Sequence, residues 1–294
     1  MQKVQKVQND FKKSKLTLPF RDVLKGVISE SELKIATTSY DVLGDIAIIK
    51  IPEELIKKEK KMARALLDSN KKIKTVVKTD SVHKGKFRTQ KVKYLAGKRT
   101  FITYVKESGC VFKIRVSDSF FSSRLSFERT RVSGLVKPKD RVCIFFSGVA
   151  PFSLVVAKNN PQVEKVVSVE LNPKAHAYAL ENITLNKMEN KVTAILDDVK
   201  EYAKKTKEKF DLVVMPLPKD ADIFFDSALK VIKKNGVITL YKFVPKDDPY
   251  TEIEKNIMGI AKKEGKKVKV IFKRQVRDFS PAIIQVVLDI QVLN

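Results

Sequence analysis

The sequence has 294 residues, 43% of them hydrophobic, and a formal net charge of +25 from 59 Lys and Arg against 34 Asp and Glu. An enzyme that acts on small metabolites rarely needs such an excess of positive charge. The charge indicates a polyanionic partner, because lysines and arginines displace counterions from phosphates. The alternative explanation is a genome that favours lysine throughout its proteins. The two cysteines, Cys110 and Cys143, are too few for a disulfide framework or a four-cysteine zinc site, so we expect no metal. The sequence has no 18-residue apolar run and no signal-peptide core, so we expect a cytoplasmic protein that does not enter a membrane.

The first 118 residues predict a lead-in followed by a small α+β domain. Residues 1–35 are polar and basic and predict a tail or a short helical segment. Leu43–Ile51 predicts a strand entered through a glycine turn, and Pro52 opens a helix that continues to Leu67. Short strands are predicted at Thr75–Lys78, Tyr94–Leu95, Thr100–Val105 and Cys110–Val116. We therefore place the small domain at 36–118.

Positive charge is concentrated in this first part of the chain. Residues 1–118 hold 28 basic and 13 acidic side chains, and the segment Lys57–Arg99 alone holds sixteen basic and three acidic ones. A local concentration of this kind argues against a uniform genome bias and indicates where a polyanion binds.

The remaining residues, 119–294, alternate between strands and helices. The predicted strands are Arg141–Phe146, Lys165–Val169, Val192–Leu196, Phe210–Met215, Val237–Leu240, Lys267–Phe272 and Ile283–Val292. The predicted helices are Phe152–Lys158, Pro173–Leu185, a lysine-rich segment after Leu196, Ala221–Lys233 and Glu252–Lys263. This alternation predicts an α/β fold with a Rossmann-like, doubly wound, mostly parallel seven-stranded sheet, whose closing strand pair supplies one antiparallel edge.

Ligands of such sheets bind beyond the carboxyl ends of the strands. The first strand ends at Gly148, and Glu170 follows 22 residues later at the end of the second strand, a spacing at which a carboxylate can accept hydrogen bonds from both ribose hydroxyls. Asp197 and Asp198 end the third strand, where they could accept from an adenine amino group. The alternatives are an ordinary strand-to-helix turn at Gly148 and helix caps at the acids.

The loop also favours one class of nucleoside over another. A dinucleotide needs exposed backbone N–H groups at the helix start for its pyrophosphate. Pro151 removes one such donor and Ala150 crowds the approach, so a ligand without phosphates fits better. S-adenosylmethionine is such a ligand.

Several motifs together carry a family resemblance. They are Tyr40–Ile49, Gly85-Lys86-Phe87-Arg88, Phe120–Arg129, Phe146–Ser153, Asn172-Pro173, Glu181–Asn186 and Met215-Pro216-Leu217-Pro218. From about residue 36 to the C-terminus the chain resembles the archaeal and eukaryotic tRNA (guanine-37-N1)-methyltransferases, and it is also similar to the sister transferases that build wyosine on the same nucleoside. The resemblance implies N1 methylation of guanosine 37 in the tRNA anticodon loop, with S-adenosylmethionine as donor.

The resemblance also implies roles for particular residues. Glu128 matches a general base, Arg88 an arginine at the target guanine, and Phe120 a position often held by tyrosine. Without the resemblance, Glu128 would be interpreted as pairing with Arg124 or Arg131 on a helix, and Arg88 as a phosphate contact. A carboxylate can take the N1 proton, and a guanidinium can stabilise the charge that develops on O6.

The candidate site residues fall into two further sets. Those expected around the cofactor are Phe146, Ser147, Gly148, Val149, Pro151, Glu170, Leu171, Asp197, Asp198 and Pro216. Those expected around the target nucleoside are Phe120, Arg124, Arg129, Leu217, Pro218 and Tyr241, with Phe120 or Tyr241 stacking on the base. We expect a monomer whose small basic domain binds the anticodon stem-loop.

Three positions depart from the family pattern. Ile144 stands where the family usually has Asp, Ala150 where it has Gly, and Pro216 where it has Asn. These departures leave alternative functions open: transfer of a methyl or aminocarboxypropyl group to a wyosine intermediate, a bifunctional enzyme, or a catalytically inactive RNA-binding protein. A DNA- or protein-directed methyltransferase fits less well, since the chain lacks an Asp/Asn-Pro-Pro-aromatic stretch after the fourth strand.

Overall fold

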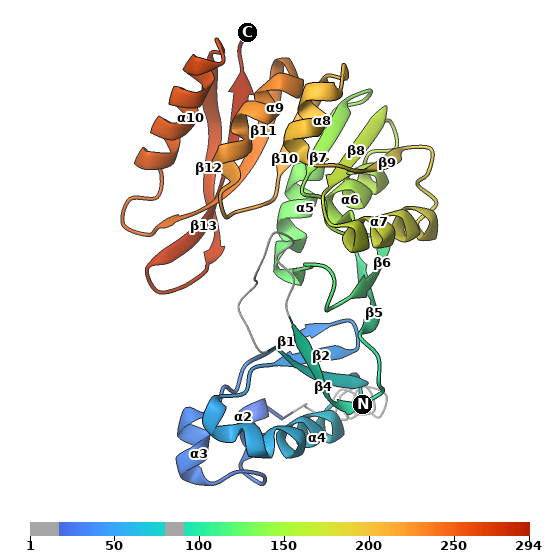
Figure 1. The fold of residues 1–294 in the computed structure, drawn as a ribbon, viewed down its shortest axis with the longest axis vertical. Coiled ribbons are helices and arrows are strands. Elements are labelled where there is room, and N and C mark those ends of the chain that lie inside the picture. The colour runs from blue at the N-terminus through green and yellow to red at the C-terminus, as the bar shows by residue number, and fades with distance from the viewer. Residues whose placement is uncertain (1–17, 80–90) are drawn as a thin grey trace, which may run out of the picture. The chain divides into compact units, whose positions relative to one another are not determined.

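The computed structural model describes residues 18–79 and 91–294, which belong to two compact units (Figure 1). The first unit ends at Thr103 and the second runs from Tyr104 to Asn294. The sequence placed this division at 118/119, and the difference has a physical cause. Side-chain amides of Asn182 and Asn186 exchange hydrogen bonds with the backbone of Lys113 and Val111, so the segment before residue 118 is fastened to the second unit.

The first unit is a four-stranded sheet with helices packed on it. Its elements are α2 (Phe20–Leu24), α3 (Glu30–Ile35), β1 (Tyr40–Leu43), β2 (Ile46–Ile49), η2 (Glu53–Lys58), α4 (Glu59–Ser69), β3 (Thr75–Thr79) and β4 (Val92–Gly97). The order is β1-β2-β3-β4, with β2 and β3 parallel and the other pairs antiparallel. Phe20, Leu24 and Leu33 are buried in its core, so the predicted lead-in includes two short helices, α2 and α3, that pack on this unit.

A single strand over Leu43–Ile51 was predicted, but the structure has a hairpin there. Gly44 takes a positive φ of 56° and turns the chain, so that Leu43 pairs with Ile46. The residues on either side of Gly44 therefore form two short antiparallel strands.

Gly97 gives the first unit a strict backbone requirement. Its φ is +89°, and an added Cβ would lie 2.1 Å from the carbonyl oxygen of Lys74. We expect Gly97→Ala to lower the free energy of unfolding by roughly 1–3 kcal/mol from backbone strain alone. Gly259→Ala, in the middle of a helix with open space around it, should instead raise it by about 0.5–1 kcal/mol. Urea denaturation measures both, and equal effects at the two glycines would contradict the argument.

The second unit begins with a two-stranded ribbon and continues as alternating strands and helices. Its strands are β5 (Ile102–Glu107, which starts in the first unit), β6 (Cys110–Arg115), β7 (Arg141–Phe145), β8 (Lys165–Glu170), β9 (Val192–Leu196), β10 (Phe210–Met215), β11 (Ile232–Pro245), β12 (Val268–Asp278) and β13 (Ile283–Val292). Its helices are η3 (Ser123–Leu125), α5 (Ser126–Ser133), α6 (Pro151–Asn159), α7 (Pro173–Leu185), α8 (Val199–Lys205), η4 (Ala221–Phe224), α9 (Phe225–Val231) and α10 (Thr251–Lys263).

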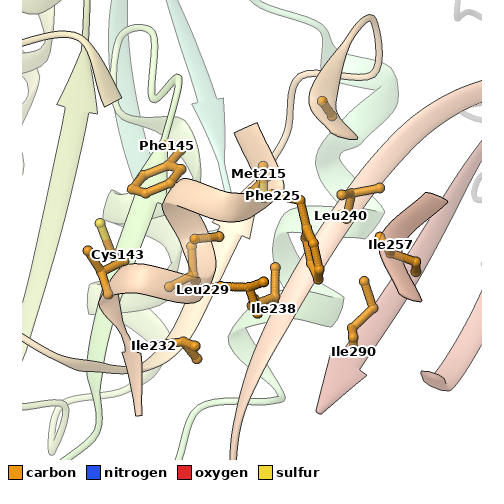
Figure 2. Packing of buried hydrophobic residues seen from close by; sticks show 14 of the residues in the cluster. Cys143, Phe145, Met215, Phe225, Leu229, Ile232, Ile238, Leu240, Ile257 and Ile290 are labelled. Atoms are coloured by element: carbon orange, nitrogen blue, oxygen red, sulfur yellow. The ribbon is translucent and has the colours of Figure 1, made fainter. Parts of the chain in front are cut away.

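The predicted seven-stranded sheet is confirmed. Its order is β12-β13-β11-β10-β7-β8-β9, parallel throughout except for β13, which runs antiparallel to both neighbours. One face carries the apolar core against α8, α9 and α10, with Phe145, Met215, Phe225, Leu240 and Ile257 packed together (Figure 2). The strand order reverses between β7 and β10, so a crevice for a ligand is expected beyond their carboxyl ends.

Two element boundaries differ from the prediction. The helix expected to reach Lys233 ends at Val231, and β11 starts at Ile232 and continues to Pro245. Ile232 pairs with Phe210 of β10, and Val237–Pro245 pair with β13, so pairing within the sheet overrides the local helical pattern. Pairing between β12 and β13 extends β12 to Asp278.

Both cysteines are free and buried. Burial raises the pKa of the Cys110 thiol to about 11 and that of Cys143 well above its ordinary value. Within residues 18–79 and 91–294, no helix combines the length and apolarity needed to cross a bilayer.

Candidate active site

The loop after β7 holds three residues in left-handed backbone conformations. Phe146, Gly148 and Ala150 have φ values of 52°, 56° and 65°, and α6 starts directly afterwards with Pro151. Glycine adopts this conformation easily, whereas Phe146 and Ala150 do so at a cost in conformational energy, and such strain is concentrated at functional sites. The loop lies at the topological switch point of the sheet.

Glu170 fastens this loop to the end of β8. Its Oε2 accepts the Gly148 N–H at 2.7 Å, and its Oε1 accepts the Asn172 N–H at 2.7 Å. Burial raises the pKa of Glu170 above its ordinary value, although the backbone donors act in the opposite direction. The acid and the glycine loop, which are 22 residues apart in the sequence, are therefore joined by a hydrogen bond.

Asp197 and Asp198 end β9 beside this acid. The Asp197 N–H donates to the Glu170 carbonyl at 3.1 Å, which places the two strand ends side by side. The Asp198 side chain accepts the Lys200 N–H at 2.9 Å and caps α8. The helix-cap interpretation thus holds for Asp198, and a cap whose backbone borders the crevice can still contact a nucleoside.

Ser147 gives the loop an unsatisfied polar atom. Its Oγ is buried and has no hydrogen-bond partner among the described residues. A buried hydroxyl without a partner costs free energy, which a ligand with complementary polar groups would recover. The Ser147 hydroxyl and the Glu170 carboxylate therefore supply polar groups that fit the nucleoside part of S-adenosylmethionine.

Glu128 lies on α5, 1% exposed, at the centre of a polar cluster. Its Oε2 accepts the Tyr241 hydroxyl at 2.7 Å and Arg131 Nε at 2.9 Å, and its Oε1 accepts Arg274 Nη2. The ring of Tyr241 lies 6.1 Å, between centroids, from that of Phe152 in the first turn of α6. The carboxylate is therefore connected to the segment that follows the Gly148 loop.

A second acid, which sequence reasoning missed, supports this cluster. Asp289 on β13 accepts Arg131 Nη1 at 2.6 Å and the Thr239 hydroxyl at 2.8 Å, and is 2% exposed. Arg131 thus bridges two buried carboxylates, and its own pKa is raised in spite of burial because Asp289 and Glu128 surround it. The sequence signal that could have identified this acid is its position inside the apolar run Ile283–Val292, because a charged residue in a buried strand needs a partner of opposite charge.

Two of the residues expected around the target nucleoside are engaged inside the protein. Tyr241 is 1% exposed, and burial beside Glu128 raises its pKa well above the ordinary value. Its ring is therefore not free to stack on a base, which corrects that expectation, and its hydroxyl donates to Glu128 instead. Arg129 is equally buried and makes a bidentate ion pair with Glu107 at 2.5 and 2.6 Å. Its role is corrected to anchoring α5 on β5.

The other candidates fall into exposed and buried groups. At least partly exposed are Phe120, Arg124, Phe146, Leu171, Asp197, Asp198, Pro216, Leu217 and Pro218. Val149 and Pro151 are buried, so their side chains pack inside the protein. Arg88 lies outside the described residues.

Two of the exposed candidates, Pro216 and Phe120, lie near the loop that follows β7. Val214 pairs with Ile144, so Pro216 stands level with Phe146 at the same end of the sheet. A Cβ on Gly148 would lie 3.6 Å from the Phe120 carbonyl, which places Phe120 beside the loop.

A shallow lysine-lined depression, formed in part by Lys209 and Lys230, lies instead at the starting end of β10. No group of three or more metal-binding side chains occurs in the described part of the chain.

Two family models match the chain. The TRM5/TYW2 methyltransferase domain matches residues 103–271, and the TYW2 N-terminal domain matches residues 20–100. The two matches adjoin near the division between the compact units.

Individual relatives agree with these models. A tRNA (guanine(37)-N(1))-methyltransferase, Trm5b of Pyrococcus abyssi, is 38% identical over 87% of this chain and 75% of its own. The structure of aTrm5 in complex with tRNALeu has a TM-score of 0.81 and 30% identity, covering 95% of this chain and 79% of that one. The Trm5 of Methanocaldococcus jannaschii in complex with adenosine has a TM-score of 0.77 and 29% identity, covering 94% and 78%.

Proposed function

Since the chain belongs to the TRM5/TYW2 methyltransferase family, we propose that it methylates N1 of guanosine 37 in tRNA, with S-adenosylmethionine as methyl donor. The observation that carries this proposal is the 38% identity, over 87% of the chain, to an enzyme named for this reaction. The loop at Gly148, fastened by Glu170, and the buried acid Glu128 supply a nucleoside site and a base within one compact unit.

In the proposed site, the residues around the loop bind the cofactor. Glu170 accepts hydrogen bonds from the ribose hydroxyls, and Ser147 donates or accepts one through its unpartnered Oγ. The backbone at Phe146, Gly148 and Val149, together with Leu171, Asp197, Asp198 and Pro216, lines the remainder. When bound, S-adenosylmethionine supplies an electrophilic methyl group on a sulfonium centre, so the protein chiefly has to align the two reactants.

Glu128 is proposed as the base that takes the guanine N1 proton. Both of its carboxylate oxygens accept hydrogen bonds within the protein, so one of these hydrogen bonds must break when the guanine binds. Tyr241 and Arg131 hold Oε2, which fixes the direction in which Oε1 can accept. Phe120, Arg124, Leu217 and Pro218 are proposed to contact the anticodon loop, and Arg88 the guanine.

Nucleoside mass spectrometry tests the reaction directly. Transcripts carrying G37, A37 or a wyosine precursor are incubated with enzyme and S-adenosylmethionine, digested and analysed. 1-Methylguanosine from the G37 transcript alone supports the proposal. The match of residues 20–100 to a TYW2 N-terminal domain favours a wyosine-pathway transferase as the second candidate, and this candidate predicts product from the precursor instead. An inactive RNA-binding protein predicts no product from any transcript.

Exposed cations of the first unit are proposed to hold the tRNA backbone. Lys71, Lys72, Lys98 and Arg99 are exposed, and a hydrogen bond from the Lys98 N–H to the Lys74 carbonyl draws their two segments together. Replacing these four with glutamine should weaken tRNA binding and reduce the slope of log affinity against log salt by about 0.7–0.9 for each phosphate that is no longer neutralised. Filter binding at several salt concentrations measures this slope.

A variant of equal charge serves as the control for that experiment. It replaces four exposed lysines in and beside α10, namely Lys255, Lys262, Lys263 and Lys267. If both variants change the slope equally, net charge rather than the first unit accounts for binding. The remainder of the segment Lys57–Arg99 includes residues outside those that the structure describes.

We also propose that the enzyme works in the cytoplasm, where its tRNA substrate occurs, as a monomer and without a metal ion. Light scattering coupled to gel filtration measures the mass of the enzyme in solution. Activity in the presence of EDTA measures whether a divalent ion takes part, apart from any needed to fold the tRNA.

A further inference from the structure

Glu128 is covered on its accessible side by Arg274. Among the described partners of this carboxylate, Tyr241 is 1% exposed and the Arg131 side chain 13%, whereas the Arg274 side chain is 37% exposed. Tyr241 and Arg131 donate to Oε2, and Arg274 donates to Oε1. A nucleobase that approaches from solvent therefore meets the Arg274 guanidinium before it reaches the Glu128 carboxylate.

The surroundings of Arg274 allow its guanidinium to change partners. The side chain extends from β12, and its guanidinium carbon lies 4.7 Å from the ring centroid of Phe127, which is 64% exposed. Its Nε is buried and has no hydrogen-bond partner among the described residues. An arginine stacked on an exposed ring, with one donor unsatisfied, can turn toward a new acceptor while the ring still supports it.

The register of the sheet keeps Arg274 on the face where Glu128 lies. Val287 of β13 pairs with both Arg274 and Tyr241, and directly opposed residues of antiparallel strands share a face. Arg274 and Tyr241 thus flank the carboxylate from two strands that are not themselves neighbours.

A carboxylate with a guanidinium beside it is complementary to the edge of guanine that reacts. That edge presents the N1–H as donor and O6 as acceptor. We propose that Arg274 is a further catalytic residue, which covers Glu128 in the free enzyme and donates to O6 when the guanine enters. This inference rests on the proposed function, and adds a second cation to the Arg88 that the family resemblance implies.

The proposed step balances in atoms and charge. The N1 proton passes to Glu128 Oε1, the position that Arg274 vacates. The N1 electron pair forms the new bond to the methyl carbon, and the carbon–sulfur bond breaks with its pair remaining on sulfur. Arg274 stabilises the negative charge that N1 deprotonation places on O6.

The test compares Arg274→Gln and Arg274→Lys with Lys273→Gln. Lys273 is the neighbouring cation of β12 and pairs with Glu254 on α10, at 2.6 Å, so it serves as a matched control on the opposite face. Single-turnover formation of 1-methylguanosine in a G37 transcript is measured with enzyme in excess, alongside the tRNA dissociation constant. We expect Arg274→Gln to slow the reaction on the order of tenfold, the effect of one charged hydrogen bond, with tRNA affinity little changed. Arg274→Lys should recover part of the rate, and Lys273→Gln should keep it.

Three results would overturn the inference. A wild-type rate in Arg274→Gln would show that the guanidinium does not contact the reacting base, and a faster rate would show that it merely obstructs Glu128. A slower rate matched by an equal loss of tRNA affinity would assign Arg274 to binding. Failure of the proposed function is distinguishable, because the wild-type enzyme would then form no 1-methylguanosine.

Discussion

Glu128→Gln is expected to lower the single-turnover rate of guanine methylation by about 10²–10⁴-fold. Glutamine keeps the shape of the side chain but cannot take the N1 proton. Cofactor binding should persist, because Glu128 lies outside the Gly148–Glu170 contact that holds the loop. Mass spectrometry of the digested transcript gives the rate, and calorimetry with S-adenosylhomocysteine gives the affinity for the cofactor product.

A control is needed because Glu128 also pairs with two arginines in a buried cluster. Removing one member of a buried ion pair commonly costs about 3–5 kcal/mol of folding free energy. Glu107→Gln removes the acid of another buried pair, with Arg129 of the same helix, without touching the proposed base. If the two variants lost similar activity, destabilisation of α5 would explain both results and Glu128 would not be the base.

Glu170→Gln is expected to weaken S-adenosylhomocysteine binding on the order of 10²-fold, the effect of two hydrogen bonds to a charged acceptor. The variant also loses an acceptor for the Gly148 N–H, so part of the loss reflects a looser loop. Glu181→Gln on α7, which breaks an ion pair with Lys113, is the control. Equal affinities for wild-type protein and Glu170→Gln would contradict the assignment of Glu170 to the ribose.

The affinity of this site should also depend on pH. Burial raises the pKa of Glu170 above 4.5, so the carboxyl gains its proton at a higher pH than an exposed glutamate. Protonation removes the charge and turns one oxygen into an O–H donor, so the carboxyl accepts less strongly from two ribose hydroxyls, and affinity should fall as the pH drops through this raised pKa. The stability of the fold should depend on pH in the opposite direction to the ligand affinity. The stabilising contribution of Glu170 is present below its pKa in the unfolded chain and is lost as the pH rises through its pKa in the folded protein. Calorimetry over the pH range in which this carboxyl titrates should show the dependence in wild-type protein, and Glu170→Gln should remove it.

Local patterns predicted most strands, most helices and the acid near the loop. Alternating strands and helices indicated the sheet, and the spacing between Gly148 and Glu170 indicated an acid at the end of the neighbouring parallel strand, which is where Glu170 lies. The end of α9 at Val231 was missed because Ile232 pairs with Phe210 of β10, and the local helical pattern carries no sign of that pairing.

The cluster around Glu128 was beyond the reach of such patterns. Tyr241 and Arg274 lie 113 and 146 residues from Glu128 in the sequence, and they meet it through the antiparallel end of the sheet. Their side chains could equally have pointed to solvent or to a base, as was expected of Tyr241. Only the register of β11, β12 and β13 places them on one face.

The two buried thiols make the chain a ready background for site-specific labelling. Cys110 and Cys143 are the complete cysteine content, and their raised pKa values keep both in the unreactive thiol form at neutral pH. A cysteine introduced at an exposed position such as Lys71 or Lys262 would therefore be the preferred site of a maleimide dye. A donor and acceptor pair at these two positions would follow the separation of the two units as RNA is added, without any native cysteine having to be replaced.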